Sequence, residues 1–178
     1  MTTPALTTTS NGGGISPALK TILTAGFIVG LLDASAAMVH SYFWNDVTPD
    51  IVWKYVASGA IGRSAFTGGG GIVALGLFFH FLIAFIFTII LFYGYPVISK
   101  LKLPVVITGI LWGLVVWNVM HWIVAPMSSV PPRKAPFDIV KVLPQLGIHM
   151  FLVGLPMTLV IHRYYSRKSR LANAHSEI

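Results

Sequence analysis

The stretch GIVALGLFFHFLIAFIFTIILFYGY at residues 71–95 decides the fold of this chain. It contains no Asp, Glu, Lys or Arg, and Pro96 follows it directly. A helix that crosses the hydrocarbon of a bilayer needs about 20 mostly apolar residues. The stretch therefore predicts a membrane-spanning helix that ends at the proline.

Three other apolar stretches are long enough to span a bilayer in the same way. The predicted spans, with the one above, are residues 17–44, 71–95, 104–125 and 144–165. Ser16 followed by Pro17 is typical of a helix start and supports the first of them. We therefore expect an all-α fold, an integral membrane four-helix bundle.

Composition supports this class. The chain has 178 residues, of which 55% are hydrophobic and 10% charged, and its mean hydropathy is +0.78. It is short enough for a single domain, which we place at residues 17–165, between a disordered N-terminal tail (1–16) and a basic cytoplasmic tail (166–178). The absence of cysteine excludes disulfides, thiolate metal sites and covalent c-type haem.

The net charge of +7 comes from Lys and Arg outside the apolar stretches. There they act as topology signals and as contacts for anionic lipids, above all at the C-terminal tail, so no nucleic-acid partner is predicted. Their distribution favours both termini in the cytoplasm. A cleaved signal peptide is the alternative for the first span, because residues 21–32 and Ala34-Ser-Ala36 imitate one, but Asp33 beside the cleavage site argues against it.

A shorter helix is predicted between the first two spans. Thr48, Pro49 and Asp50 form a helix start, and Gly62 marks the end. Its apolar face indicates an amphipathic helix at the outer surface, which we interpret as an interfacial anchor in preference to a lid over the bundle. The glycine run at 68–71 indicates a flexible turn in preference to an anion-binding loop.

Histidines give the main functional signal, one in each predicted span: His40, His80, His121 and His149. At 1.5 Å of rise per residue all four lie in the outer half of the membrane, within about 7 Å of depth. Each also lies on a helix face that carries small residues, the face on which membrane helices pack. Because imidazole is costly in hydrocarbon, this pattern predicts one shared polar site in the outer leaflet.

Neutral imidazole is a ligand for zinc, copper and iron, and two histidines can hold a b-type haem as axial ligands. A metal ion or a b-type haem is therefore the candidate cofactor of the four histidines. Asp33 and Asn118 lie in the same half and are candidates for a proton or ion relay. The alternatives for Asp33 are a neutral structural acid or a partner of a histidine, and a lone histidine can be a packing residue.

Three segments resemble an uncharacterised family of small bacterial four-span integral membrane proteins. They are GRSAFTGGG at 62–70, LGLFFHFLIAF at 75–85, and His149 followed by GLP at 154–156. The resemblance covers about residues 25–163. It implies the four-span fold and the bacterial cytoplasmic (inner) membrane, and it implies no activity.

The sequence favours a membrane binding or accessory component over an enzyme. The chain has no Ser-His-Asp or His-Glu-x-x-His spacing that would indicate a hydrolase. Two other functions stay open: an ion or proton translocator that uses Asp33, and a structural or lipid-organising subunit without a cofactor. A homo-oligomer or a larger membrane complex is a further expected assembly.

Overall fold

The computed structural model describes residues 14–131 and 139–176, and this part of the chain is helical with no strand. Four of its helices are long and apolar enough to cross a membrane: Pro17–Asn45, Gly70–Leu101, Val105–Met127 and Val142–Ala174. The prediction of an all-α, four-span membrane bundle is confirmed. Residues 1–13, most of the predicted N-terminal tail, lie outside the described residues.

The first half of the chain contains two spans and the helix between them. Its elements are α1 (Pro17–Asn45), α2 (Pro49–Ile61), the 3₁₀ helix η1 (Gly62–Thr67), α3 (Gly70–Ile98) and the 3₁₀ turn η2 (Ser99–Leu101). The second half contains the other two spans, each interrupted by a π-helical segment. Its elements are α4 (Val105–Val119), the π-helix η3 (Met120–Val124), α5 (Ala125–Met127), α6 (Ile139–Ile148), the π-helix η4 (His149–Gly154) and α7 (Leu155–Ser176).

The predicted helix starts are present. Ser16 caps α1 by accepting a 3.2 Å hydrogen bond from the backbone N–H of Leu19, and Pro17 is the first helical residue. Thr48 precedes α2, and Gly62 ends it with a φ of 66°, a conformation that favours glycine.

The prediction that the second span ends at Pro96 is wrong, because α3 continues through this proline to Ile98. A proline inside a helix leaves the carbonyl four residues earlier without its N–H partner. Here that carbonyl belongs to Phe92, and it accepts a 2.9 Å hydrogen bond from the hydroxyl of Tyr165 on α7. The orphaned group is satisfied, and the helix can continue in the membrane.

The last span also differs from its predicted bounds of 144–165. Helix α6 begins at Ile139 and contains Pro144, and α7 runs to Ser176. The predicted basic tail is therefore a helical continuation of the span as far as Ser176. Arg, Lys, Leu and Ala in this segment are good helix formers, and their local preference favours continuation of the helix.

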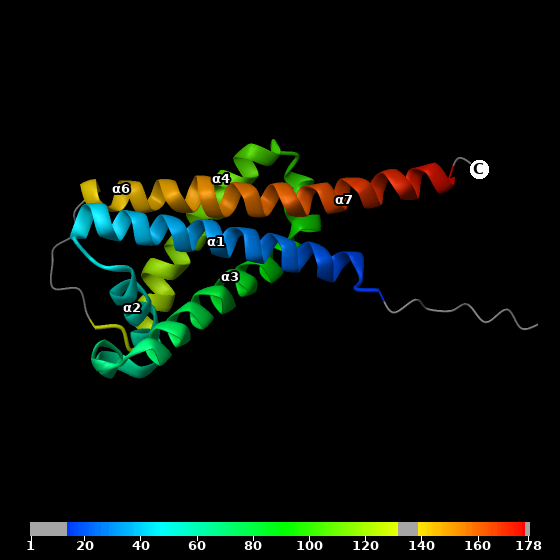
Figure 1. The fold of residues 1–178 in the computed structure, drawn as a ribbon. Coiled ribbons are helices and arrows are strands. Elements are labelled where there is room, and N and C mark those ends of the chain that lie inside the picture. Colours follow the sequence, from blue (N-terminus) through cyan, green and yellow to red (C-terminus); the bar gives the residue numbers. More distant parts are fainter. Residues whose placement is uncertain (1–13, 132–138, 177–178) are drawn as a thin grey trace, which may run out of the picture.

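Figure 1 shows how the spans are arranged. Helix α1 lies beside the α6–η4–α7 rod and runs in the opposite direction, and α3 diverges from α1 as it approaches α2. The start of α1, the α3–α4 turn and the end of α7 lie at one end of the bundle, which we call the terminal end. Helix α2 and α5 lie at the opposite end, called the α2 end.

Glycines allow the closest helix contacts. On α1, a Cβ at Gly26 or Gly30 would overlap a phenyl ring of α3. In the second half, a Cβ at Gly154 of η4 would overlap the backbone of Gly109 and Gly113 on α4. The predicted small-residue faces are thus packing surfaces, as membrane helices require.

Helix α2 is packed into the bundle and does not simply lie on its surface. Trp53, Ala57 and Ser58 are buried, and the backbone of Trp53 rests directly on Gly76 of α3. The anchor interpretation of α2 gave no reason to expect so close a contact with α3. The physical reason for this contact is Gly76, because any larger residue there would keep the α2 backbone away from α3.

The four spans do not form a closed ring of contacts. Helix α3 packs against α1, α2 and α7, and α4 packs against η4 and α7, but α3 and α4 do not pack extensively against each other. The side between these two consecutive spans is therefore the open side of the bundle.

Candidate functional site

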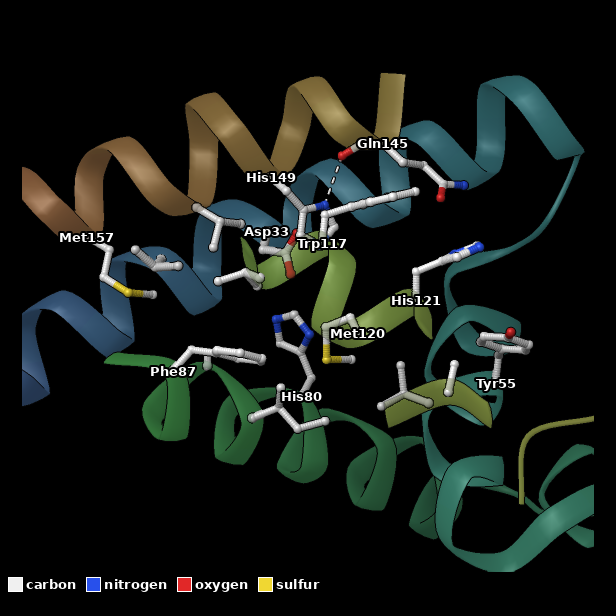
Figure 2. A pocket seen from close by; sticks show the side chains of 17 residues that line it. Asp33, Tyr55, His80, Phe87, Trp117, Met120, His121, Gln145, His149 and Met157 are labelled. Carbon is white, nitrogen blue, oxygen red and sulfur yellow. Dashed lines mark hydrogen bonds between the residues drawn. The ribbon is translucent and has the colours of Figure 1, made fainter. Parts of the chain in front are cut away.

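A cavity of about 290 Å³ lies between the spans, and Tyr55 and Val56 of α2 form part of its lining. Every span and α2 contribute to its wall. Figure 2 shows its polar and aromatic lining, which includes Asp33, Tyr55, His80, Phe87, Trp117, His121, Gln145 and His149. At roughly 30 Å³ per water molecule, the cavity has room for about ten waters or one small organic molecule.

Asp33 is the only acidic residue inside the described spans. Gly30, three residues earlier, packs against α3. Because residues three apart lie on the same face of a helix, Asp33 also faces into the bundle, where it lines the cavity. The carboxyl group is partly exposed to the cavity and makes no hydrogen bond or ion pair with any described residue. A carboxyl group in a membrane span is costly unless it is paired or protonated, so Asp33 is poised for a partner.

His80 rises from α3 on the wall opposite His149 (Figure 2). Its Nε2 lies 2.9 Å from the carbonyl oxygen of Gly30. A carbonyl only accepts, so Nε2 carries the proton and donates, which leaves Nδ1 with its lone pair. Trp53 of α2 packs edge-on against the imidazole, with ring centroids 5.4 Å apart.

His149, on the opposite wall, is also held by a hydrogen bond to a backbone carbonyl. Its Nδ1 lies 2.8 Å from the carbonyl oxygen of Gln145 and must donate, so Nε2 keeps a lone pair. His149 is also the first residue of the π-helix η4, whose widened turn is the segment that packs against Gly113. Such π segments occur frequently at functional sites.

His121 belongs to the other π-helix, η3, and lines the cavity toward the α2 end. Its imidazole stacks on the indole of Trp117, with ring centroids 4.8 Å apart and planes inclined by 10°. The two side chains are one turn apart on α4–η3, and they form one flat wall of the cavity (Figure 2).

His40 does not join the other three histidines. It is buried two turns beyond Asp33, where it stacks on Trp44 at 5.6 Å, and its Nε2 has no hydrogen-bond partner among the described residues. The depth estimate assumed parallel spans. Because α1 and α3 diverge toward the α2 end, equal depth does not bring His40 to the cavity.

Asn118 also lies away from the site. Its side chain is exposed on the bundle surface and donates a 2.8 Å hydrogen bond to the carbonyl of Leu114. Adjacent residues of a helix point about 100° apart, so Trp117 faces inward and Asn118 does not. A relay that links Asp33 to Asn118 is therefore not formed in this structure.

The predicted four-histidine ligand set is not assembled either. Within residues 14–131 and 139–176, no group of three or more His, Asp or Glu side chains is close enough to hold a metal ion. The physical reason is that His80 and His149 stand on opposite walls and His40 lies outside. The volume is at the low end of the roughly 300–1,000 Å³ of small-molecule pockets.

The cavity is closed toward the terminal end. Met157 forms part of its floor, and this side chain is fully buried together with Leu91 and Ile161. The indole N–H of Trp112 donates to the Met157 sulfur at 3.3 Å and fixes it in place. The described residues therefore form a blind pocket and not a continuous polar path.

Among the polar and aromatic lining residues, four were not predicted as site residues: Tyr55, Phe87, Trp117 and Gln145. Trp117 shares the inward face of α4 with Gly113, and Gln145 lies one turn before His149, so helical periodicity was the available signal. The position of Tyr55 depends on the tight docking of α2, which has no local signal.

No family model, curated protein or solved structure matches this chain.

Proposed function

We propose that the protein is a small integral membrane binding protein whose cavity holds a small organic cation against Asp33. The observation that carries this proposal is the Asp33 carboxyl group, which borders the cavity and has no partner among the described residues. A cationic ligand would neutralise a charge that is otherwise expensive at this depth.

The rest of the lining matches such a ligand. Nδ1 of His80 and Nε2 of His149 are acceptors, because each ring uses its only N–H on a backbone carbonyl. Phe87 and Trp117 add aromatic surface, and an ammonium group near an aromatic face gains about 0.5–2 kcal/mol. Ammonium ligands are recognised by a carboxylate, by hydrogen-bond acceptors and by aromatic rings, and the lining of this cavity contains all three.

The spacing of these groups favours an organic cation over a metal ion. A single ion needs ligand atoms within about 2.0–2.2 Å of its centre, and the described side chains are not grouped in that way. A protonated or quaternary amine is larger, and it can contact Asp33 together with His80 or His149 without the close grouping of ligand atoms that a metal ion needs.

A structural or lipid-organising role without a cofactor is the second candidate. It is favoured by the hydrogen bonds of His80 to Gly30 and of His149 to Gln145, because each satisfies an imidazole within the bundle and stabilises helix contacts. Ion translocation has less support, since the layer below the cavity is tightly packed.

The cellular setting is proposed with the function. The family resemblance and the Lys and Arg distribution support a bacterial inner membrane with the terminal end in the cytoplasm. In that orientation the cavity lies in the outer half of the membrane. Anionic lipids at the basic end of α7, and a homo-oligomer or larger complex, are compatible partners.

The test is calorimetric titration of the protein in zwitterionic nanodiscs with benzylammonium and with benzyl alcohol, its uncharged counterpart. We expect the cation to bind and the alcohol to bind at least tenfold more weakly. Asp33→Asn should weaken benzylammonium by about 10- to 100-fold, since a hydrogen bond to a charged group contributes roughly 1.5–3 kcal/mol.

Asp46→Asn is the matched control. Asp46 follows α1 outside the cavity in a left-handed conformation that Asn also adopts, so this variant should bind like the wild type. Equal binding of cation and alcohol, or an unchanged affinity in Asp33→Asn, would reject the cation site. The structural role would then be the better explanation.

A further inference from the structure

A second cavity, of about 540 Å³, lies at the terminal end of the bundle. It is bounded by the end of α3, the α3–α4 turn, the start of α4, and α7, and it shares no lining residue with the first cavity. Its lining has a polar part and an apolar part. The polar part consists of Tyr95, Ser99, Thr108, His162, Tyr165, Ser166 and Ser169, and the apolar part consists of Pro96, Leu103 and Val105.

His162 forms hydrogen bonds with two other residues of the polar part of this lining. The hydroxyl of Tyr95 lies 2.8 Å from its Nδ1, and Oγ of Ser166 lies 3.2 Å from its Nε2. A neutral imidazole donates to one of these hydroxyls and accepts from the other. The hydroxyl that accepts keeps its own proton, so the cluster always offers one O–H donor to a ligand.

The charge around this cavity is positive. The elements that bound it carry exposed basic side chains: Lys100, Lys102, Arg163, Arg167, Lys168 and Arg170. The acids among the described residues are Asp33, Asp46 and Asp50, and none of them lies on these elements. The lining itself contains no Lys, Arg, Asp or Glu. An anion is therefore attracted to the rim and meets the O–H donor of the His162 cluster inside, whereas the hydroxyls of Ser99 and Thr108 donate to backbone carbonyls.

We propose that this cavity binds the phosphate headgroup of an anionic phospholipid, with an acyl chain along its apolar part. The polar cluster around His162 would donate to phosphate oxygens, and Leu103 and Val105 would face the chain. The site is separate from the proposed cation site and does not depend on it.

Two features favour a lipid over a soluble phosphate. The lining is amphiphilic, and a free phosphate ion has no apolar part to cover Pro96 and Leu103. The cavity also lies between the ends of α3 and α4, the two spans that do not pack extensively against each other. A chain that extends from the headgroup would enter the open side of the bundle, where apolar helix faces are available.

The experiment is native mass spectrometry of the protein titrated with phosphatidylglycerol and with phosphatidylcholine. We expect one phosphatidylglycerol to bind at least fivefold more tightly than phosphatidylcholine and than further phosphatidylglycerol molecules. The double variant Tyr95→Phe/Ser166→Ala removes both hydroxyls and should abolish this preference. Arg63→Gln, a charge change at an exposed position of η1 outside this lining and its rim, should retain it.

A second variant separates loss of the site from loss of folding. Leu103→Trp fills the apolar part and leaves the hydrogen bonds of His162 unchanged, and it should also abolish the single tight lipid. Equal binding of the two lipids, or the same loss in Arg63→Gln as in the double variant, would overturn the proposal. Displacement of the lipid by millimolar glycerol phosphate would assign the site to a soluble phosphate ester and would also overturn it.

Discussion

The hydroxyl of Tyr165 donates a 2.9 Å hydrogen bond to the carbonyl oxygen of Phe92, the group that Pro96 leaves without a helical partner. The two residues are 73 positions apart in the sequence. Their contact joins α3 to α7 and allows α3 to continue past a proline. This hydrogen bond thus satisfies the free carbonyl of α3 and also connects two spans.

This relationship predicts a coupling between Tyr165 and Pro96. We expect Tyr165→Phe to destabilise the bundle by about 1–2 kcal/mol, because a buried carbonyl loses its donor. In a Pro96→Ala background the new N–H of residue 96 reaches the same carbonyl, and the cost of Tyr165→Phe should fall by at least half. Unfolding in mixed micelles measures both values, and equal costs in the two backgrounds would disprove the coupling.

Helix contact through Gly154 gives a second prediction. Gly154→Ala should destabilise the protein by about 3 kcal/mol or prevent folding, because the new Cβ would overlap the backbone of Gly109 and Gly113. Gly147→Ala is the control on the same span. A Cβ at Gly147 meets nothing within 4 Å, so this variant should be neutral or more stable by up to about 1 kcal/mol. Similar thermal stability of the two variants would contradict the packing described here.

The hydrogen bonds of two cavity histidines predict their tautomers. In ¹⁵N NMR spectra of the protein in nanodiscs at neutral pH, His80 should carry its proton on Nε2 and His149 on Nδ1. Substitution of either histidine assigns the signals. The opposite tautomer at either position would mean that its lone pair faces a carbonyl, which is repulsive and incompatible with the structure.

Orientation in the membrane is testable because the chain has no cysteine. Single cysteines at Ser99, Ser129 and Ser169 are all at exposed positions. Only Ser129→Cys, at the α2 end, should react with an impermeant maleimide added to intact cells. Labelling of Ser99→Cys or Ser169→Cys from outside would invert the proposed topology.

Acid should loosen the start of α2. The hydroxyl of Thr48 and the ammonium of Lys54 donate to Asp50 at 2.6 and 3.1 Å, and these bonds lower the pKa of its carboxyl group. A lowered folded pKa means that the stabilisation is fully present above the ordinary Asp pKa and is lost as pH falls from there through the lower pKa of the folded state. The protection of the first turn of α2 against hydrogen exchange, taken relative to the intrinsic exchange rate at each pH, should fall in this range, and Asp50→Asn should remove this pH dependence.

The sequence was sufficient for the number and type of spans because each apolar stretch is long and uninterrupted. It was not sufficient at the prolines. Pro96 is a reliable local stop signal, and only a hydroxyl from a distant span reverses its effect. The π segments at His121 and His149 were invisible for a similar reason, since they arise where the spans pack and carry no local signature.

The candidate site was predictable in part. Helical periodicity placed His80, His121 and His149 on inward faces, and the structure brings these three to one cavity with Asp33. Depth along a span was a poorer predictor of which side chains meet, because the calculation of depth treats the helices as parallel rods. The divergence of α3 from α1 separates His40 from the others, and the angle between these two helices cannot be derived from the sequence of either span alone.

The open side between α3 and α4 has a consequence for biosynthesis. Helices that follow each other in the chain commonly insert as a hairpin, but these two have few contacts to hold one together. Helices α1, α2 and α3 can instead assemble as soon as they leave the ribosome, whereas α4 must wait for η4 and α7, which are made last. The cavity takes its walls from both groups, so it can form only when synthesis is complete. A nascent chain halted after α4 would have three spans in the bilayer and no binding site.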